Sequence, residues 1–131
     1  MKKHITRLPP HSEESEQGII GCCLTTPIQS IPETQIVLRS AEYFYDLRHQ
    51  TIWESIAALE LREVDMISVV SHLKKRGVLD DVGGISYLNT CQDSVPSTAN
   101  LPVYLKEVEE KLVLRRAIQA CADITSRCYD H

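Results

Sequence analysis

The chain has 131 residues and a mass of 14.8 kDa, which is the usual size of a single domain. Apolar residues make up 43% of it and charged residues 24%, and this balance excludes a disordered or a fibrous chain. The formal net charge of −4 argues against a domain whose main task is to bind phosphate backbones, because such domains carry a basic excess.

Residues 1–11 are predicted to form an extended N-terminal arm. The chain begins with basic residues, but Pro9-Pro10 and several glutamates stand where a signal peptide needs its apolar core. The longest apolar stretch nearby, Gly18 to Leu24, is far shorter than the roughly 20 residues of a membrane span. We therefore expect a cytoplasmic protein that makes no contact with a membrane.

A head of several helices is predicted over residues 12–99. Ser12 is the expected N-cap of a first helix that runs to about Leu24, and the second half of this helix is apolar on all sides. It should therefore be the buried central helix of the head. Gly18 and Gly21 lie about one turn apart, so we expect another backbone to approach this helix closely.

Two further helices and an aromatic connector are expected next. Thr25-Thr26-Pro27 should end the first helix, and a second is predicted to begin near Ser30 with Pro32 in its first turn. The aromatic rings of a connector over residues 40–47 should close the edge of the core. A third helix is predicted over residues 48–61 from apolar side chains at three- and four-residue spacing. They are Ile52, Trp53, Ile56 and Leu59.

The last part of the head is predicted to contain two short helices. Asp65 can cap a fourth helix, and Gly77 stands just after its predicted end. Its expected apolar face comprises Ile67, Val70 and Leu73. The basic run Lys74-Lys75-Arg76 lies in its last turn, where it complements the helix dipole. A fifth helix should open at Gly83-Gly84, followed by a polar loop over residues 93–99.

A long helix is predicted over residues 100–131, with Asn100 as its N-cap. About 28 residues without a helix breaker span roughly 42 Å. A compact domain of this size has a radius of gyration of only ~14 Å. The helix must therefore project beyond the head.

Two apolar rows, offset by two residues, lie along this long helix. The first comprises Leu101, Leu105, Val108 and Leu112. The second comprises Leu114, Ile118, Cys121, Ile124 or Thr125, and Cys128. The first row can pack on the head, whereas the second needs a following helix, a second subunit or a partner protein. The alternative is a bent helix that packs throughout its length.

The sequence carries no enzyme signature. It has no Gly-x4-Gly-Lys-Ser/Thr phosphate loop, no Gly-x-Ser-x-Gly turn and no zinc-type histidine spacing. Its five cysteines have no paired spacing, so we expect reduced and mostly buried thiols. We therefore expect no catalytic residues, no cofactor and no metal in this chain. An enzyme that uses the Cys22 or Cys23 thiol is an alternative, and it requires a low thiol pKa.

Five sequence blocks stand in order along the chain. They are Leu8-Pro-Pro-His-Ser-Glu-Glu-Ser-Glu-Gln; Ser40-Ala-Glu-Tyr-Phe-Tyr with His49 and Ile52; Asp65-Met-Ile-Ser-Val-Val-Ser-His-Leu; Gly77-Val-Leu-Asp-Asp-Val-Gly-Gly-Ile-Ser-Tyr-Leu; and Val95-Pro-Ser-Thr-Ala-Asn with Tyr104. In this order they resemble the N-terminal domain of the bacterial or phage replicative DNA helicase of the DnaB type, from residue 8 to about residue 124. Three departures are Gly18 with Cys22-Cys23 in the first helix, a short connection over residues 60–64, and Pro32, which should delay the second helix.

The resemblance implies an all-α fold, with a compact multi-helix head followed by the first arm of a long helical hairpin. It implies that hairpins of neighbouring subunits pair, as a dimer or in a hexamer, and that the domains form a collar. The collar binds primase and, in some systems, a helicase loader. The resemblance places the ATPase, with its ATP and Mg²⁺, in a C-terminal motor domain that this chain lacks. This chain would then be a non-catalytic part of an ATP-dependent DNA helicase in DNA replication.

The expected interaction surface lies on the second half of the long helix. The candidate interface residues are Leu112, Leu114, Arg115, Arg116, Ile118, Cys121 and Ile124. The two arginines are expected either to bind carboxylates of a partner or to remain as solvated charges at the rim. A helical nucleic-acid-binding module is the alternative function, but its only basic clusters would be Lys74-Lys75-Arg76 and Arg115-Arg116. We expect little direct DNA binding.

Overall fold

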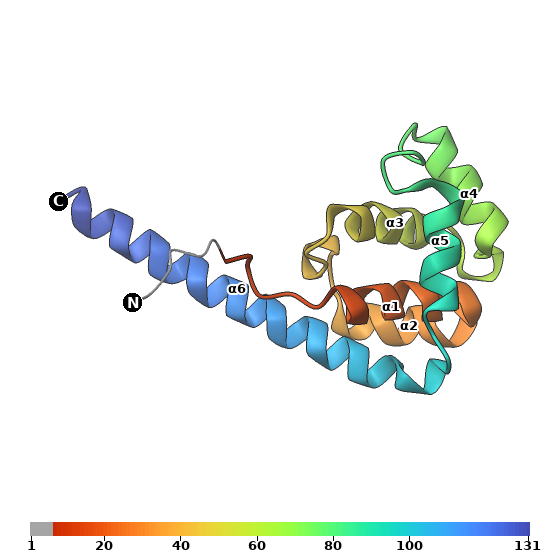
Figure 1. Cartoon of the computed structure of the whole chain (residues 1–131), viewed down its shortest axis with the longest axis horizontal. Helices are drawn as coiled ribbons and strands as arrows, with labels where there is room; N and C mark the ends of the chain where they lie inside the picture. Colours follow the sequence, from red (N-terminus) through yellow and green to blue (C-terminus); the bar gives the residue numbers. More distant parts are fainter. Residues whose placement is uncertain (1–6) are drawn as a thin grey trace.

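The computed structural model describes residues 7–131, which fold into six α-helices with no strand in that range (Figure 1). The helices are α1 (Glu13–Thr25), α2 (Pro27–Val37), α3 (Leu47–Ala58), α4 (Met66–Lys75), α5 (Gly84–Asp93) and α6 (Leu101–Tyr129). Short 3-10 turns are η1 (Ala41–Tyr43), η2 (Leu61–Glu63) and η3 (Thr98–Asn100). This architecture confirms the predicted all-α class, with a compact head and one long helix that projects from it. Residues 7–11 form no helix, and residues 1–6 of the predicted arm lie outside the described residues.

Helix α1 is the centre of the head, as its apolar sequence predicts. It packs on α2, α3, α5 and α6, and residues 18–24 are all buried. The Ser12 hydroxyl accepts a hydrogen bond from the backbone N–H of Ser15 at 3.2 Å, which caps the helix. A side chain on Gly21 would collide with the backbone carbonyl of Cys91, so the expected close backbone approach is made by α5. At Gly18 the neighbour is instead the aromatic ring of Tyr104.

Helix α2 begins earlier than the sequence predicted. Thr26 is its N-cap and Pro27 its first residue, so α2 follows α1 almost directly and does not start near Ser30. The ring of Pro27 fits the first turn because its missing N–H would have no helical acceptor there. Pro32 lies inside the helix and does not delay its start. Pro32 has no backbone N–H, and the helix tolerates the loss of this one hydrogen bond.

Helices α3 and α4 differ from their predictions in extent and in orientation. Helix α3 ends at Ala58, before the predicted end at residue 61, and η2 follows it. In α4, Asp65 caps the helix as expected, with its carboxylate accepting from the Ser68 N–H at 2.7 Å. The buried face, however, is formed by Val69 and Leu73, while the side chain of Ile67 is 80% exposed. Ile67 therefore points away from the core.

Helix α6 has two halves with different surroundings. The first apolar row, Leu101, Leu105, Val108 and Leu112, is at most 3% exposed and packs on the head as predicted. Beyond Arg115 every residue is exposed, and the helix extends away from the other helices (Figure 1). Asn100 stands at the N-cap position, but its side chain makes no capping hydrogen bond. None of the helices in the described part combines the length and apolar character that a membrane crossing requires.

Candidate functional site on the long helix

The structure divides the candidate interface residues into three groups. Leu112 is only 3% exposed, so its side chain is already covered by this chain and belongs to the head-facing row. Leu114, Ile118 and Ile124 are 48%, 56% and 60% exposed, and Cys121 is also exposed. Arg115 and Arg116 contact the head. An exposed apolar surface is therefore left on the projecting half of α6.

The exposed row runs along one face of the projecting half. Its members Leu114, Ile118, Cys121, Thr125 and Cys128 are separated alternately by four and three residues, so they share one stripe. Ile124 lies beside the stripe. The hydroxyl of Thr125 donates to the Cys121 carbonyl at 2.9 Å, which satisfies this donor within the helix. This stripe carries no charged side chain and is suited to bury against another helix.

The Arg115 guanidinium donates to backbone carbonyls of its own chain. It donates to Pro10 at 2.9 Å, to Tyr43 at 3.1 Å and to Glu42 at 3.4 Å. The guanidinium also lies 5.7 Å from the centre of the Tyr45 ring. Arg115 thereby joins the N-terminal arm and the aromatic connector to α6.

Arg116 forms an ion pair with Glu42 of the head, at 3.2 Å between Nη2 and Oε1. Both side chains are more than half exposed, so this pair contributes little to stability. In the other basic cluster, Lys74-Lys75-Arg76, the Arg76 side chain donates to the Thr51 carbonyl and the Ser55 hydroxyl and pairs with Glu54. Three of the five cations that a nucleic-acid module would need are therefore directed at the head.

A buried polar cluster joins α1, α3 and α5 inside the head. The Glu16 carboxylate accepts from the backbone N–H groups of Tyr45 and Asp46, at 2.8 and 3.2 Å, and from His49 Nδ1 at 2.8 Å. His49 Nε2 lies 2.6 Å from the Tyr87 hydroxyl. Glu16 and His49 are at most 1% exposed, which leaves a substrate no access to the pair. The cluster holds the head together, and sequence reasoning missed it because its members lie up to 71 positions apart in the chain.

The thiols also oppose the alternative of a cysteine enzyme. Burial raises the pKa of Cys22 to about 11 and of Cys23 to about 12, whereas a nucleophilic thiol needs a lowered value. Burial likewise raises the pKa of Cys91 to about 11. All five cysteines are free, as predicted, but Cys121 and Cys128 are exposed. Among the described residues, the accessible thiols are therefore those of Cys121 and Cys128 on the exposed row of α6.

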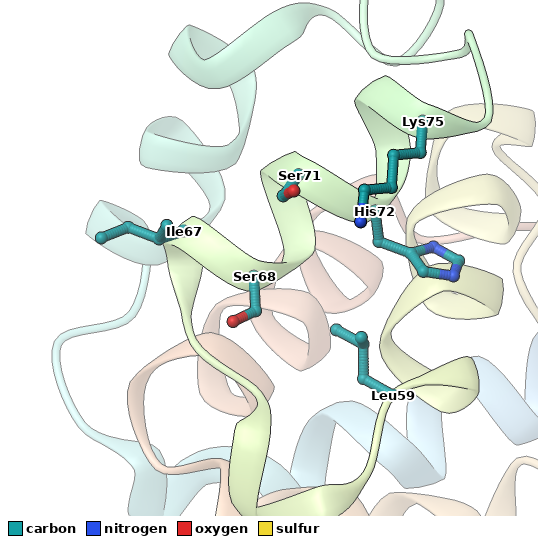
Figure 2. A pocket seen from close by; sticks show the side chains of 6 residues that line it. All are labelled: Leu59, Ile67, Ser68, Ser71, His72 and Lys75. Atoms are coloured by element: carbon teal, nitrogen blue, oxygen red, sulfur yellow. The ribbon is translucent and has the colours of Figure 1, made fainter.

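A cavity of about 290 Å³ lies at the far end of the head, between α4 and the end of α3 (Figure 2). It is lined by Leu59, Ile67, Ser68, Ser71, His72 and Lys75. His72 Nδ1 is hydrogen-bonded to the Ser55 hydroxyl at 2.9 Å. In the part of the chain that the structure describes, no group of three or more potential metal ligands is present. This cavity is remote from the exposed row of α6.

Comparison with known proteins gives a consistent family match. The model of the DnaB-like helicase N terminal domain family matches residues 8–110. The chain is 36% identical over 125 residues to the replicative DNA helicase DnaB of Geobacillus stearothermophilus. It is 37% identical over 125 residues to the replicative DNA helicase DnaC of Bacillus subtilis. Each match covers 94% of this chain but only 27% of the relative, so the chain spans about a quarter of these relatives.

A solved structure shares the fold. The crystal structure of the N-terminal domain of DnaB helicase from Mycobacterium tuberculosis superposes with a TM-score of 0.88 at 31% sequence identity. The match covers 94% of this chain and 88% of that structure's chain. The similarity therefore includes most of α6 as well as the head.

Proposed function

This chain belongs to the family of DnaB-like helicase N-terminal domains, and from that membership we propose that it is a non-catalytic assembly and partner-binding domain of a replicative DNA helicase. In this proposal α6 is the first arm of a helical hairpin, and copies of the chain associate through it. The domains form the collar of a hexamer, which binds primase and in some systems a loader. ATP and Mg²⁺ act in a separate motor domain, in the cytoplasm.

The observation that carries this proposal is the exposed row of α6. Leu114, Ile118 and Ile124 keep about half of their surface exposed on a helix that projects from the head. Fully burying such a side chain is worth about 1.5–3 kcal/mol, so covering several of them favours association after its entropic cost.

The first experiment tests self-association through this row. Sedimentation velocity should detect concentration-dependent association of the unaltered chain, and Ile118→Asp should abolish it, because a carboxylate would be buried without a partner. Ile67→Asp is the matched control, because Ile67 is equally apolar and 80% exposed on α4. Unchanged association of the Ile118 variant would contradict the assignment of this row.

A second experiment tests the proposed partner. The chain is titrated by calorimetry with the C-terminal domain of the primase from the same organism, and light scattering gives the mass of each species. We expect saturable binding with a defined stoichiometry. Absence of binding by the folded, associated chain would contradict the proposal that this domain binds primase.

A further inference from the structure

We infer that residues 7–11 of the N-terminal arm form part of the surface that a second copy covers, and that Arg115 is the positioning residue that holds the arm there. The inference rests on the proposed self-association through α6 and extends that interface to a segment more than 100 positions away in the chain. The occupant is the exposed α6 row of the second copy.

The arm is fixed to α6 by specific contacts. Arg115 donates to the Pro10 carbonyl at 2.9 Å, and its other terminal nitrogen bonds the Tyr43 carbonyl at 3.1 Å. The His11 ring stacks on Tyr45, with ring centres 4.3 Å apart, and its Nδ1 donates to the Pro9 carbonyl at 2.7 Å. The arm consequently runs alongside α6 (Figure 1). The planar guanidinium holds these two nitrogens in a fixed fork, and a lysine ammonium, with a single nitrogen, does not reproduce that geometry.

The arm and α6 enclose an apolar groove. Its volume is about 560 Å³, and it is lined by Arg7, Leu8, Pro9, Pro10, Arg115, Ile118 and Gln119. Ile118 belongs both to this groove and to the exposed row, so the two surfaces are continuous. Leu8 is 67% exposed, although the segment that carries it is held in place. Leu8 therefore extends the apolar surface of the exposed α6 row onto the arm.

The size of the row favours a larger interface that includes the arm. From Leu114 to Cys128 the row is about 22 Å long, and a helix is about 10 Å wide, which gives a footprint of about 220 Å². A stable interface buries about 800 Å² of accessible surface on each partner, which is several times this flat projection. The row therefore needs adjoining surface, and the groove supplies it on the side of Arg115. Because Nη1 and Nη2 of Arg115 already donate to carbonyl oxygens of their own chain, a second copy need not supply acceptors for these bonds.

The test measures association and arm position separately. In sedimentation experiments, Leu8→Asp should raise the dissociation constant at least about tenfold, while Ile67→Asp on α4 should leave it unchanged. Arg115→Lys keeps the charge and should weaken association about fivefold, because the ammonium loses the forked contacts. Thermal unfolding followed by circular dichroism verifies that each variant folds.

Arm position is read from tryptic cleavage after Arg7 at concentrations where the chain is monomeric. Arg115→Lys and Arg115→Gln should both accelerate this cleavage relative to the unaltered chain. If the unaltered chain associates but Leu8→Asp associates equally well, the inference is overturned while the proposed function stands. If cleavage is unchanged in both Arg115 variants, Arg115 does not position the arm. A chain that stays monomeric at all concentrations overturns both the inference and the proposed self-association.

Discussion

The two halves of α6 are similar in apolar content, but the apolar row of the first half is buried against the head and that of the second half is exposed. In the first half, Leu101, Leu105, Val108 and Leu112 face the head and are at most 3% exposed. From Leu114 onward the row is offset by two residues, and its aliphatic side chains are about half exposed. Register, and not composition, therefore decides whether an apolar row of this helix is buried against the head or stays exposed. The projecting half should therefore tolerate substitutions that the head cannot.

The largest expected difference is in the free energy of unfolding when a carboxylate is removed from the head or from the projecting half of α6. Glu16→Ala should lower the free energy of unfolding by about 3–5 kcal/mol, because it leaves the buried His49 without its partner. Asp123→Ala, which removes an exposed acceptor of Gln119 on the projecting half, should change it by less than about 0.5 kcal/mol. Urea unfolding followed by circular dichroism measures both. Equal effects would show that the buried pair does not hold the head.

A matched pair of leucines tests the register directly. Leu105→Ala should lower the free energy of unfolding by about 2–5 kcal/mol, since Leu105 is 3% exposed and its truncation leaves a cavity. Leu114→Ala removes the same atoms from a side chain that is 48% exposed, and should lower it by less than about 1 kcal/mol in the monomer. A costly Leu114→Ala in the monomer would mean that the second row packs within its own chain.

Thiol reactivity should separate the two regions without any substitution. With iodoacetamide at pH 8, Cys121 and Cys128 should react at least about 100-fold faster than the buried Cys22, Cys23 and Cys91, whose raised pKa and burial suppress the thiolate. Mass spectrometry of peptides gives each rate. At high protein concentration, alkylation of Cys121 should slow if copies cover the row. Equal rates at all five cysteines would indicate an open head.

The smallest expected effect is a weakening of the head in acid. A hydrogen bond from the Ser68 N–H lowers the pKa of Asp65 below its ordinary value of 3.8. The carboxylate therefore stabilises α4 above that value, and this contribution disappears as the pH falls through the lowered pKa. Asp65→Asn keeps a capping side chain and should flatten the dependence of stability on pH below about 4. An unchanged acid profile in this variant would exclude Asp65 as its source.

Local sequence signals predicted much of this structure. The caps at Ser12 and Asp65, the buried α1 and the change of face between Leu112 and Leu114 all depend on residues within a few turns of one another. Such patterns can be read without knowing the partners. The start of α2 was missed because both Pro27 and Pro32 are compatible with a first turn, and the packing of α2 against α1 selects the earlier one.

The missed features depend on contacts between distant residues. Ile67 and Val69 are both apolar, and only the neighbours of α4 determine which of them faces the core. Arg115 has the charge of a partner-binding residue, but its acceptors at Pro10 and Tyr43 are carbonyls that no side-chain pattern reveals. The role of the row itself, as the contact between copies, stays a prediction.

Helix α6 contains neither glycine nor proline after Pro102, so it has no residue that commonly kinks a helix. The direction in which the exposed row faces is therefore fixed by how the first half of α6 packs on the head. One residue inserted between Leu112 and Val113 would turn the exposed row by about 100° and carry it away from the arm. Seven inserted residues would bring the row back to nearly the same face, but about 10 Å farther out. The number of residues in this helix therefore sets both the direction in which the exposed row faces and its distance from the head.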